Sequence, residues 1–235
     1  MPTMPLEALA TRPADEAEAF RALARDRLHA SPPAGLALAR GDHDLNARFD
    51  ETGRGLAPAS RDPKTAAVLI PIVRREAGLT MLFTERAGHL RAHSGQISFP
   101  GGRIDPQDAD TLAAALREAR EEIGLDPAFV EPLGYSDTYL SFSGYLVTPV
   151  VALVREGFAL AVNRAEVAEA FEIPLAFLMD EANHEMHVRS WNGSLRRYYA
   201  IAHGRHYVWG VTAGILRHLY ERLHGPRTSR RPEDS

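Results

Sequence analysis

The feature that most constrains the fold is a continuous apolar run at residues 66–73. An apolar run of this length is consistent with a buried strand. The segment Glu76-Ala77-Gly78 follows as a turn, and residues 79–84 form a second strand-like segment. The two segments and their turn predict a β-hairpin.

Helices and further strands are predicted on both sides of this hairpin. Residues 13–29 are typical of an amphipathic helix, and residues 112–123 of a stronger one that Gly124 caps at its C-terminus. Strands are also predicted at 97–99, 130–135, 146–154 and 173–175, a short helix at 166–171, a hairpin of 198–201 with 206–209 around His203-Gly204, and a closing helix at 211–223. This order of elements predicts an α/β fold, a mixed β-sheet sandwiched between helices.

The chain is expected to have one domain with an additional segment at each end. Residues 1–60 would form the N-terminal helix and an arm, and the polar, Gly-punctuated stretch 41–59 is predicted to be irregular. Residues 61–225 would form the folded domain. The charged residues 226–235 are predicted to be a disordered tail.

Composition excludes several classes of protein. The chain has no cysteine, so disulfides, thiolate metal sites and a cysteine nucleophile are impossible. It has no apolar run long enough for a transmembrane helix, and residues 1–10 lack the order of a signal peptide. The net charge of −4 gives no global attraction to nucleic acid. These features are compatible with a cytoplasmic protein that has no nucleic-acid or membrane partner. We further expect a small-molecule substrate and a monomer or homodimer.

The predicted helix at 112–123 concentrates acidic side chains on one face. Glu118, Glu121 and Glu122 are three and four residues apart, a spacing that brings side chains together on a helix. Three neighbouring carboxylates repel each other unless a cation joins them, and their hard oxygen atoms suit Mg²⁺ or Mn²⁺. The alternative is a solvated helix face on which Arg117 and Arg120 act as ion-pair partners.

The loop before this helix favours a metal site. Gly101 and Gly102 permit close approach of the backbone to another group, and Asp105 and Asp108 add carboxylates.

These residues resemble the Nudix box, which reads Gly, five residues, Glu, seven residues and then Arg-Glu-apolar-x-Glu-Glu-x-Gly-apolar. Gly102 supplies the first glycine, and residues 117–125 read Arg-Glu-Ala-Arg-Glu-Glu-Ile-Gly-Leu. The chain departs at Asp108, which stands where the first Glu is expected, and it has one extra residue between Asp108 and Arg117. The departures leave the role of Asp108 open.

The resemblance implies a Nudix fold, a Nudix hydrolase domain over residues 61–225, and hydrolysis of a diphosphate bond. It makes Glu118, Glu121 and Glu122 the ligands of Mg²⁺ or Mn²⁺. Arg117 becomes the residue that orients Glu118, so Glu118, Glu121 and Arg117 are the expected catalytic residues. The metal would neutralise the diphosphate and lower the pKa of the attacking water.

A second motif resembles the signature of the coenzyme A diphosphatase branch of the Nudix family. The matching residues are Leu82, Thr84, Arg86, Ala87, Arg91, Gly95 and Phe99-Pro100-Gly101-Gly102. Only Phe83 departs, and the branch carries the longer box seen here. The resemblance, which extends over roughly residues 65–223, implies that Arg86, Arg91, Gly101 and Gly102 bind the substrate. Arginine suits the diphosphate and 3′-phosphate of coenzyme A.

The expected reaction is therefore hydrolysis of coenzyme A or an acyl derivative to 3′,5′-ADP and 4′-phosphopantetheine or its acyl form. Two alternatives stay open: a Nudix hydrolase of ADP-ribose, dinucleotides or nucleoside triphosphates, and a non-catalytic nucleotide-sensing Nudix module. Glu166 is either a further carboxylate of the metal site or a residue at a helix N-terminus. His93 is expected in a solvent-facing loop rather than at the substrate, and His203 and His206 beside a hairpin turn. Tyr207 and Trp209 are expected in the core rather than stacked on an adenine.

Overall fold

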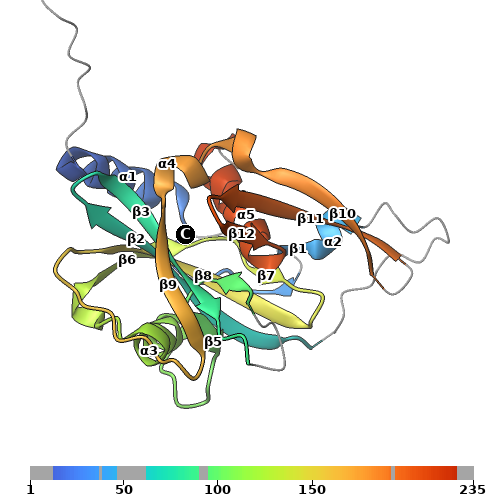
Figure 1. Cartoon of the computed structure of the whole chain (residues 1–235), viewed down its shortest axis with the longest axis horizontal. Helices are drawn as coiled ribbons and strands as arrows, with labels where there is room; N and C mark the ends of the chain where they lie inside the picture. Colours follow the sequence, from blue (N-terminus) through green and yellow to red (C-terminus); the bar gives the residue numbers. More distant parts are fainter. Residues whose placement is uncertain (1–12, 37–38, 47–61, 90–94, 192–193, 227–235) are drawn as a thin grey trace, which may run out of the picture.

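The computed structural model describes residues 13–36, 39–46, 62–89, 95–191 and 194–226 (Figure 1). The helices are α1 (Pro13–Arg27), α2 (Asp42–Asn46), α3 (Thr111–Ile123), α4 (Leu175–Leu178) and α5 (Val211–His224), with short 3₁₀ helices at Pro127–Phe129 and Glu181–Asn183. The strands are β1 (Arg40–Gly41), β2 (Lys64–Arg75), β3 (Gly78–Arg86), β4 (Ile97–Ser98), β5 (Gly101–Arg103), β6 (Val130–Tyr135), β7 (Tyr139–Leu140), β8 (Tyr145–Val154), β9 (Val167–Pro174), β10 (Glu185–Trp191), β11 (Ser194–His203) and β12 (His206–Trp209). No helix among these is long and apolar enough to cross a membrane.

A nine-stranded mixed sheet dominates the described part of the chain. The central strand β2 runs parallel to β8 and antiparallel to β3, its partner in the predicted hairpin. Its remaining neighbour is the short strand β5, which pairs with it over three residues. The strands β10, β11 and β12 form a separate antiparallel sheet.

Helices cover both faces of the large sheet (Figure 1). Leu69 and Val73 of β2 pack into the cluster that contains α3, whereas Ile70 and Ile72 pack into the cluster that contains α1 and α5. Alternate residues of a strand point to opposite faces, so burial on both faces explains why the β2 sequence is continuously apolar. The α/β architecture predicted from the sequence is confirmed.

Helix α3 is closed at both ends by residues that suit these positions. The Asp110 side chain accepts a hydrogen bond from the Ala113 amide at 2.8 Å, which satisfies one of the free amides of the first turn. Gly124 follows the last turn with a φ of 69° and donates to the Ala119 and Arg120 carbonyls. The two caps fix where the acidic helix begins and ends.

The segment at 166–171 was predicted to be a short helix, and this prediction is wrong. The chain there forms β9, which pairs antiparallel with β3 from Thr80↔Pro174 to Arg86↔Val167. Its Glu-rich and Ala-rich sequence has no strong strand preference. Pairing with an available sheet edge and burial of Val167 and Ile173 override that weak local preference.

The arm at 41–59 was predicted to be irregular, but its first residues form the helix α2. Asn46, at the end of α2, accepts a hydrogen bond from the Arg197 amide at 2.8 Å and donates to the Arg197 carbonyl at 3.1 Å. Its side chain therefore completes the backbone pairing of β11 where β12 does not reach. Residues 47–59 lie outside the described residues, as does most of the predicted tail at 226–235.

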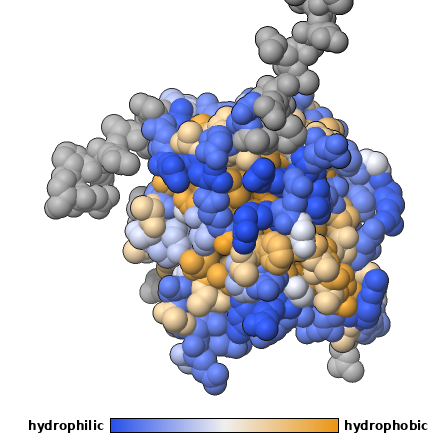
Figure 2. All heavy atoms as spheres, turned by 90° about the vertical axis from the view of Figure 1, so that its left-hand side faces the viewer, coloured by the Kyte–Doolittle hydropathy of each residue, from blue (hydrophilic) through white to orange (hydrophobic). Residues whose placement is uncertain are grey.

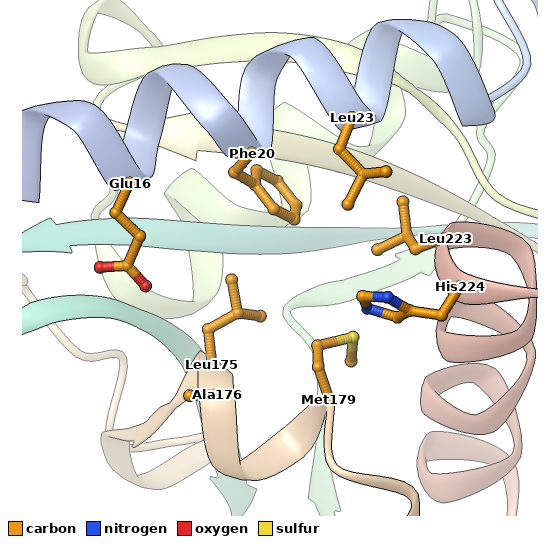
Figure 3. A pocket seen from close by; sticks show the side chains of 8 residues that line it. All are labelled: Glu16, Phe20, Leu23, Leu175, Ala176, Met179, Leu223 and His224. Carbon is orange, nitrogen blue, oxygen red and sulfur yellow. The ribbon is translucent and has the colours of Figure 1, made fainter. Parts of the chain in front are cut away.

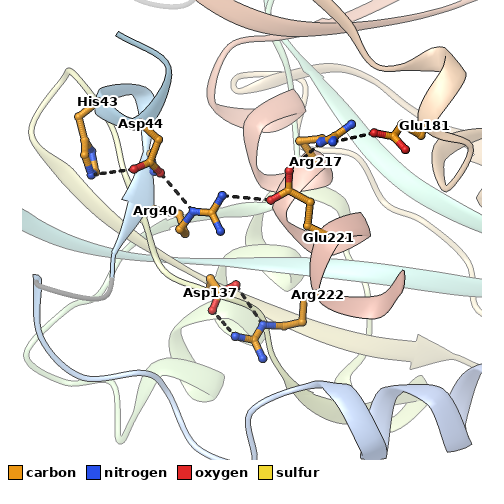
Figure 4. Close-up of polar contacts among 9 residues, drawn as sticks. Arg40, His43, Asp44, Asp137, Glu181, Arg217, Glu221 and Arg222 are labelled. Carbon is orange, nitrogen blue, oxygen red and sulfur yellow. Dashed lines mark hydrogen bonds and ion pairs between the residues drawn. The ribbon is translucent and has the colours of Figure 1, made fainter. Parts of the chain in front are cut away.

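Ion pairs join helix α5 to Arg40 of β1 and to Asp137 in the loop between β6 and β7 (Figure 4). Arg40 contacts Glu221 at 3.0 Å and Asp44 at 3.2 Å. Asp137 is paired with Arg222 of α5 and lies 3.1 Å from the His29 ring. These contacts hold the C-terminal helix in place on the face of the sheet opposite α3.

Helix α5 also carries a buried histidine that should make stability depend on pH. His218 is 5% exposed, and burial lowers its pKa to about 4. An unfolded histidine has a pKa of about 6.5. The unfolded state therefore binds the proton first, and the free energy of unfolding should fall by about 3 kcal/mol as the pH drops from 6.5 to 4.

The substitution His218→Gln is expected to remove this part of the pH dependence, as measured by urea unfolding at pH 8 and pH 5. His224→Gln is the matched control, because His224 is exposed on the same helix. A wild-type pH dependence in the His218 variant would assign the effect to other groups.

Candidate active site

The two glycines of the loop make the site compact. Strand β5 pairs with β2 through Gly102↔Ala67 and Gly101↔Val68. A Cβ atom at Gly101 would lie 2.4 Å from the Ala67 carbonyl oxygen, and one at Gly102 would lie 2.5 Å from the Glu118 carboxyl group. Glycine is therefore required at Gly101, where the clash is with backbone, whereas a side chain at Gly102 would displace the Glu118 carboxyl group, which rests directly on the loop backbone.

Glu122 is the most buried carboxyl group of α3. It is 5% exposed, and its Oε2 accepts a hydrogen bond from the Gly101 amide at 3.2 Å. The pKa of Glu122 is raised to about 7, mainly by burial; the carboxylates of Glu118 and Glu166 act in the same direction, whereas the Gly101 hydrogen bond and the charge of Arg86 oppose them. Burial disfavours the charged form of this carboxyl group, and a bound cation would stabilise that form.

Arg117 is anchored by Asp108, the residue whose role the sequence left open. The Arg117 Nε and Nη2 atoms donate to the two Asp108 oxygens at 2.8 and 3.0 Å. The Asp108 side chain is only 6% exposed, and it also accepts from the Asp105 amide at 2.8 Å. The hydrogen bonds from Arg117 lower the pKa of Asp108. Asp108 thus fixes the guanidinium plane in a bidentate geometry.

The free edge of the Arg117 guanidinium faces two of the predicted metal ligands. Its Nη1 atom lies 3.0 Å from Glu118 Oε1 and 3.1 Å from Glu121 Oε2. Burial raises the pKa of Glu118, although Arg117 acts in the opposite direction. The Glu121 side chain is 58% exposed. Arg117 therefore contacts Glu118, as predicted, and also holds Glu121.

The predicted ligands lie on one side of α3, but their carboxyl groups point to different partners. Glu122 points to the loop backbone, and Glu118 and Glu121 point to Arg117. Among the residues that the structure describes, no three acidic or histidine side chains are gathered closely enough to enclose an ion. The donor set itself fits a hard divalent cation, because it consists of carboxylates, and neighbouring carboxylates raise the pKa of Glu118 and of Glu122.

The backbone next to Arg86 lies against Glu166, and both residues act electrostatically on Glu122. The Ala87 amide donates to the Glu166 carbonyl at 2.8 Å, so the end of β3 lies against the start of β9. Arg86 Nε is buried and has no hydrogen-bond partner among the described residues. Glu166 acts electrostatically on both Glu118 and Glu122. Arg91 and His93 lie outside the described residues.

None of the predicted site residues lies in the β11–β12 hairpin. His203 and His206 flank the turn, as predicted, and the His206 ring stacks on Phe171 at 3.6 Å between ring centroids. Tyr207 was expected in the core, but it is 41% exposed. Trp209 is partly buried.

A cavity of about 150 Å³ lies between α1, α4 and α5, away from α3 (Figure 3). Its lining residues are Glu16, Phe20, Leu23, Leu175, Ala176, Met179, Leu223 and His224. The lining is mainly apolar and contains no arginine or lysine, so it does not suit a diphosphate. The side of the molecule that carries α1 and α3 shows polar side chains with apolar patches between them (Figure 2).

The anchoring role of Asp108 leads to a testable prediction. Asp108→Asn removes the charge that holds Arg117, and we expect metal affinity and kcat/KM to fall about ten- to a hundredfold, the usual effect of losing a group that orients a ligand. Asp105→Asn is the matched control, because the Asp105 side chain is 61% exposed and lies 3.9 Å from Arg117. Metal titration and steady-state kinetics would measure both effects, and equal losses in the two variants would contradict the assignment.

Comparison with known proteins shows the family to which the chain belongs. The NUDIX domain family matches residues 63–191. The chain is 43% identical over 177 residues to the "Uncharacterized Nudix hydrolase NudL" of Escherichia coli O1:K1 / APEC, which covers 75% of this chain and 91% of that protein. The same figures hold for the NudL protein of Shigella boydii serotype 18. Among solved structures, a C. elegans Ap4A hydrolase is similar with a TM-score of 0.42 and 19% identity, covering 47% of this chain and 80% of that one.

The chain belongs to the NUDIX family. It is a Nudix hydrolase, an enzyme that acts on pyrophosphate bonds. Enzymes of this family generally use divalent metal ions.

Proposed function

We propose that this enzyme hydrolyses the diphosphate bond of coenzyme A or an acyl derivative, with Mg²⁺ or Mn²⁺, to 3′,5′-ADP and 4′-phosphopantetheine or its acyl form. The observation that carries the substrate assignment is the segment 82–102, which resembles the coenzyme A diphosphatase signature. The position of Arg86 supports it. This arginine lies beside Glu122 and has a buried Nε atom with no partner among the described residues.

Glu118, Glu121 and Glu122 would hold the metal, with Glu166 near enough to add a further carboxylate. When bound, the metal would neutralise the diphosphate oxygens and lower the pKa of the attacking water. Binding would also relieve the repulsion that raises the pKa of Glu118 and Glu122. Glu121 would exchange its contact with Arg117 for one with the metal.

The other residues would position the substrate and the carboxylates. Arg117, held by Asp108, keeps Glu118 in place on the loop. Gly101 and Gly102 let the loop backbone approach the diphosphate closely, because neither carries a side chain. Arg86 supplies a guanidinium for a phosphate group, and Arg91 is proposed to supply another. Positioning and charge stabilisation of this kind carry most of the catalysis in phosphoryl chemistry.

The test is a comparison of specificity constants for coenzyme A, acetyl-coenzyme A, dephospho-coenzyme A, ADP-ribose and NADH. We expect the two 3′-phosphorylated substrates to be the best. A tenfold preference for ADP-ribose or NADH, equivalent to about 1.4 kcal/mol of transition-state stabilisation, would overturn the coenzyme A assignment and leave the Nudix assignment in place. Binding without turnover of any of them would favour a nucleotide-sensing module.

Arg86 should contribute to substrate binding more than to protein stability. We expect Arg86→Ala to weaken the interaction with coenzyme A by roughly 1.5–3 kcal/mol, the usual contribution of a hydrogen bond to a charged group. If Arg86 contacts the 3′-phosphate, the same change affects dephospho-coenzyme A much less. Equal losses on both substrates would place Arg86 at the diphosphate. Arg120→Ala, an exposed change on α3, is the control.

A further inference from the structure

One face of the small sheet β10–β11–β12 carries a group of aromatic rings that the proposed active site does not use. The rings belong to His187, Tyr198, Tyr207 and Trp209. Residues paired directly across antiparallel strands share a face, and so do alternate residues along one strand. The register His187↔Tyr198, Ala200↔Trp209 and Ala202↔Tyr207 therefore places all four side chains on one face.

Hydrogen bonds hold these rings in fixed positions. Tyr207 Oη lies 2.9 Å from His187 Nδ1, and His187 Nε2 lies 2.7 Å from Glu185 Oε2. The His187 and Tyr207 ring centroids are 6.1 Å apart although the residues belong to β10 and β12, so the rings meet above the intervening strand. The small residue Ala200 on that strand is only 1% exposed. A planar ligand would therefore meet a surface that is already ordered, which lowers the entropic cost of binding.

Two arginines lie directly opposite each other further along the same face. Arg189 of β10 is paired in register with Arg196 of β11, one alternate position beyond His187↔Tyr198. Arg189 is exposed and makes no ion pair with any described residue. Arg196 lies 4.4 Å from the centroid of the Phe142 ring, and its Nε is buried without a hydrogen-bond partner in the described part of the chain. Like charges directly opposite each other are destabilising. The Asp42 carboxylate is near enough to Arg196 to interact with it electrostatically, and an anion between the two arginines would remove the rest of that cost.

This face is distinct from the active site. Strands β10 and β11 lie on the right of the molecule, and α3 with its loop lies at the lower left (Figure 1). Aromatic rings bind the flat surface of a nucleobase, and arginines bind its phosphate. The pair His187↔Tyr198 and the pair Arg189↔Arg196 are two residues apart in the register, or about 7 Å along the strands, a separation that a nucleoside monophosphate can span.

We propose that this face is a second binding site, for a purine nucleoside monophosphate whose base stacks on the ring of His187, which Tyr207 holds by a hydrogen bond, and whose phosphate lies between Arg189 and Arg196. AMP is the probe. The chain has two tryptophans, Trp191 and Trp209. In a Trp191→Phe background, fluorescence therefore reports on Trp209 at the edge of the site.

The expected result is saturable quenching by AMP, and weaker quenching by adenosine or ribose 5-phosphate, each of which lacks one half of the ligand. Arg189→Gln should weaken AMP binding about tenfold, as the loss of a charged hydrogen bond does, and leave adenosine binding and turnover unchanged. Arg205→Gln is the matched control. It removes an arginine from the same sheet, at the turn, where it pairs with Glu169.

Two further variants distinguish this face from the active site. Tyr207→Ala should weaken both AMP and adenosine, and circular dichroism would check that the sheet is retained. Arg86→Ala should leave the quenching unchanged. The proposal is overturned if AMP does not quench saturably, if Arg189→Gln and Arg205→Gln behave alike, or if Arg86→Ala abolishes the quenching, since that would place AMP in the active site.

Discussion

Glu122→Gln is expected to lower kcat by roughly a hundredfold or more, because a metal ion supplies several kcal/mol of charge stabilisation and each 1.36 kcal/mol is a factor of ten in rate. The substitution keeps the shape of the side chain, and a glutamine oxygen can still accept the hydrogen bond from the Gly101 amide. It removes the charge of the carboxyl group that is most buried on α3. Steady-state kinetics at saturating Mg²⁺ would measure the loss.

The fold of this variant should be intact. Burial already disfavours the charged form of Glu122, as its raised pKa indicates, so the metal-free variant should unfold at a temperature no lower than wild type. Glu76→Gln is the matched control, because Glu76 is exposed in the turn between β2 and β3. Wild-type turnover in the Glu122 variant would show that this buried carboxyl group has no part in catalysis.

Removal of divalent metal is expected to abolish turnover, and addition of Mg²⁺ or Mn²⁺ should restore it. The charge of Glu118 raises the pKa of Glu122, and the charge of Glu121 raises that of Glu118; without a cation these carboxylates would repel a diphosphate. The two hydrophobic clusters of the domain contain none of these side chains. Chelation should therefore abolish activity without lowering the melting temperature. Both quantities would be measured in the same buffer, by steady-state kinetics and by thermal unfolding. Undiminished activity in excess chelator would contradict the proposed mechanism.

The elements that could be predicted from the sequence are those whose own residues determine them. Burial on both faces makes β2 continuously apolar, and Gly124 marks the end of α3. The elements that were missed depend on distant partners. β9 forms a strand because the edge of β3 is available for pairing. The position of α2 depends on the hydrogen bonds between Asn46 and the β11 backbone. Neither partner can be inferred from the local sequence.

The same distinction applies to the site. Helical spacing and the resemblance to the Nudix box placed the three glutamates together, but they could not indicate that Asp108 holds Arg117. That contact depends on how the loop folds back on α3, where the Asp105 amide binds the same carboxylate. The exposure of Tyr207 could not be predicted either, because an alternating strand pattern does not show which face of a small sheet is covered.

The most direct test of the central claim is the identity of the products formed from coenzyme A. The enzyme would be incubated with coenzyme A and Mg²⁺ in ¹⁸O-labelled water, and both products would be analysed by mass. The account predicts 3′,5′-ADP and 4′-phosphopantetheine in equal amounts, with one labelled oxygen on one of the two new phosphate groups. Release of inorganic phosphate with dephospho-coenzyme A, or recovery of intact coenzyme A, would contradict it.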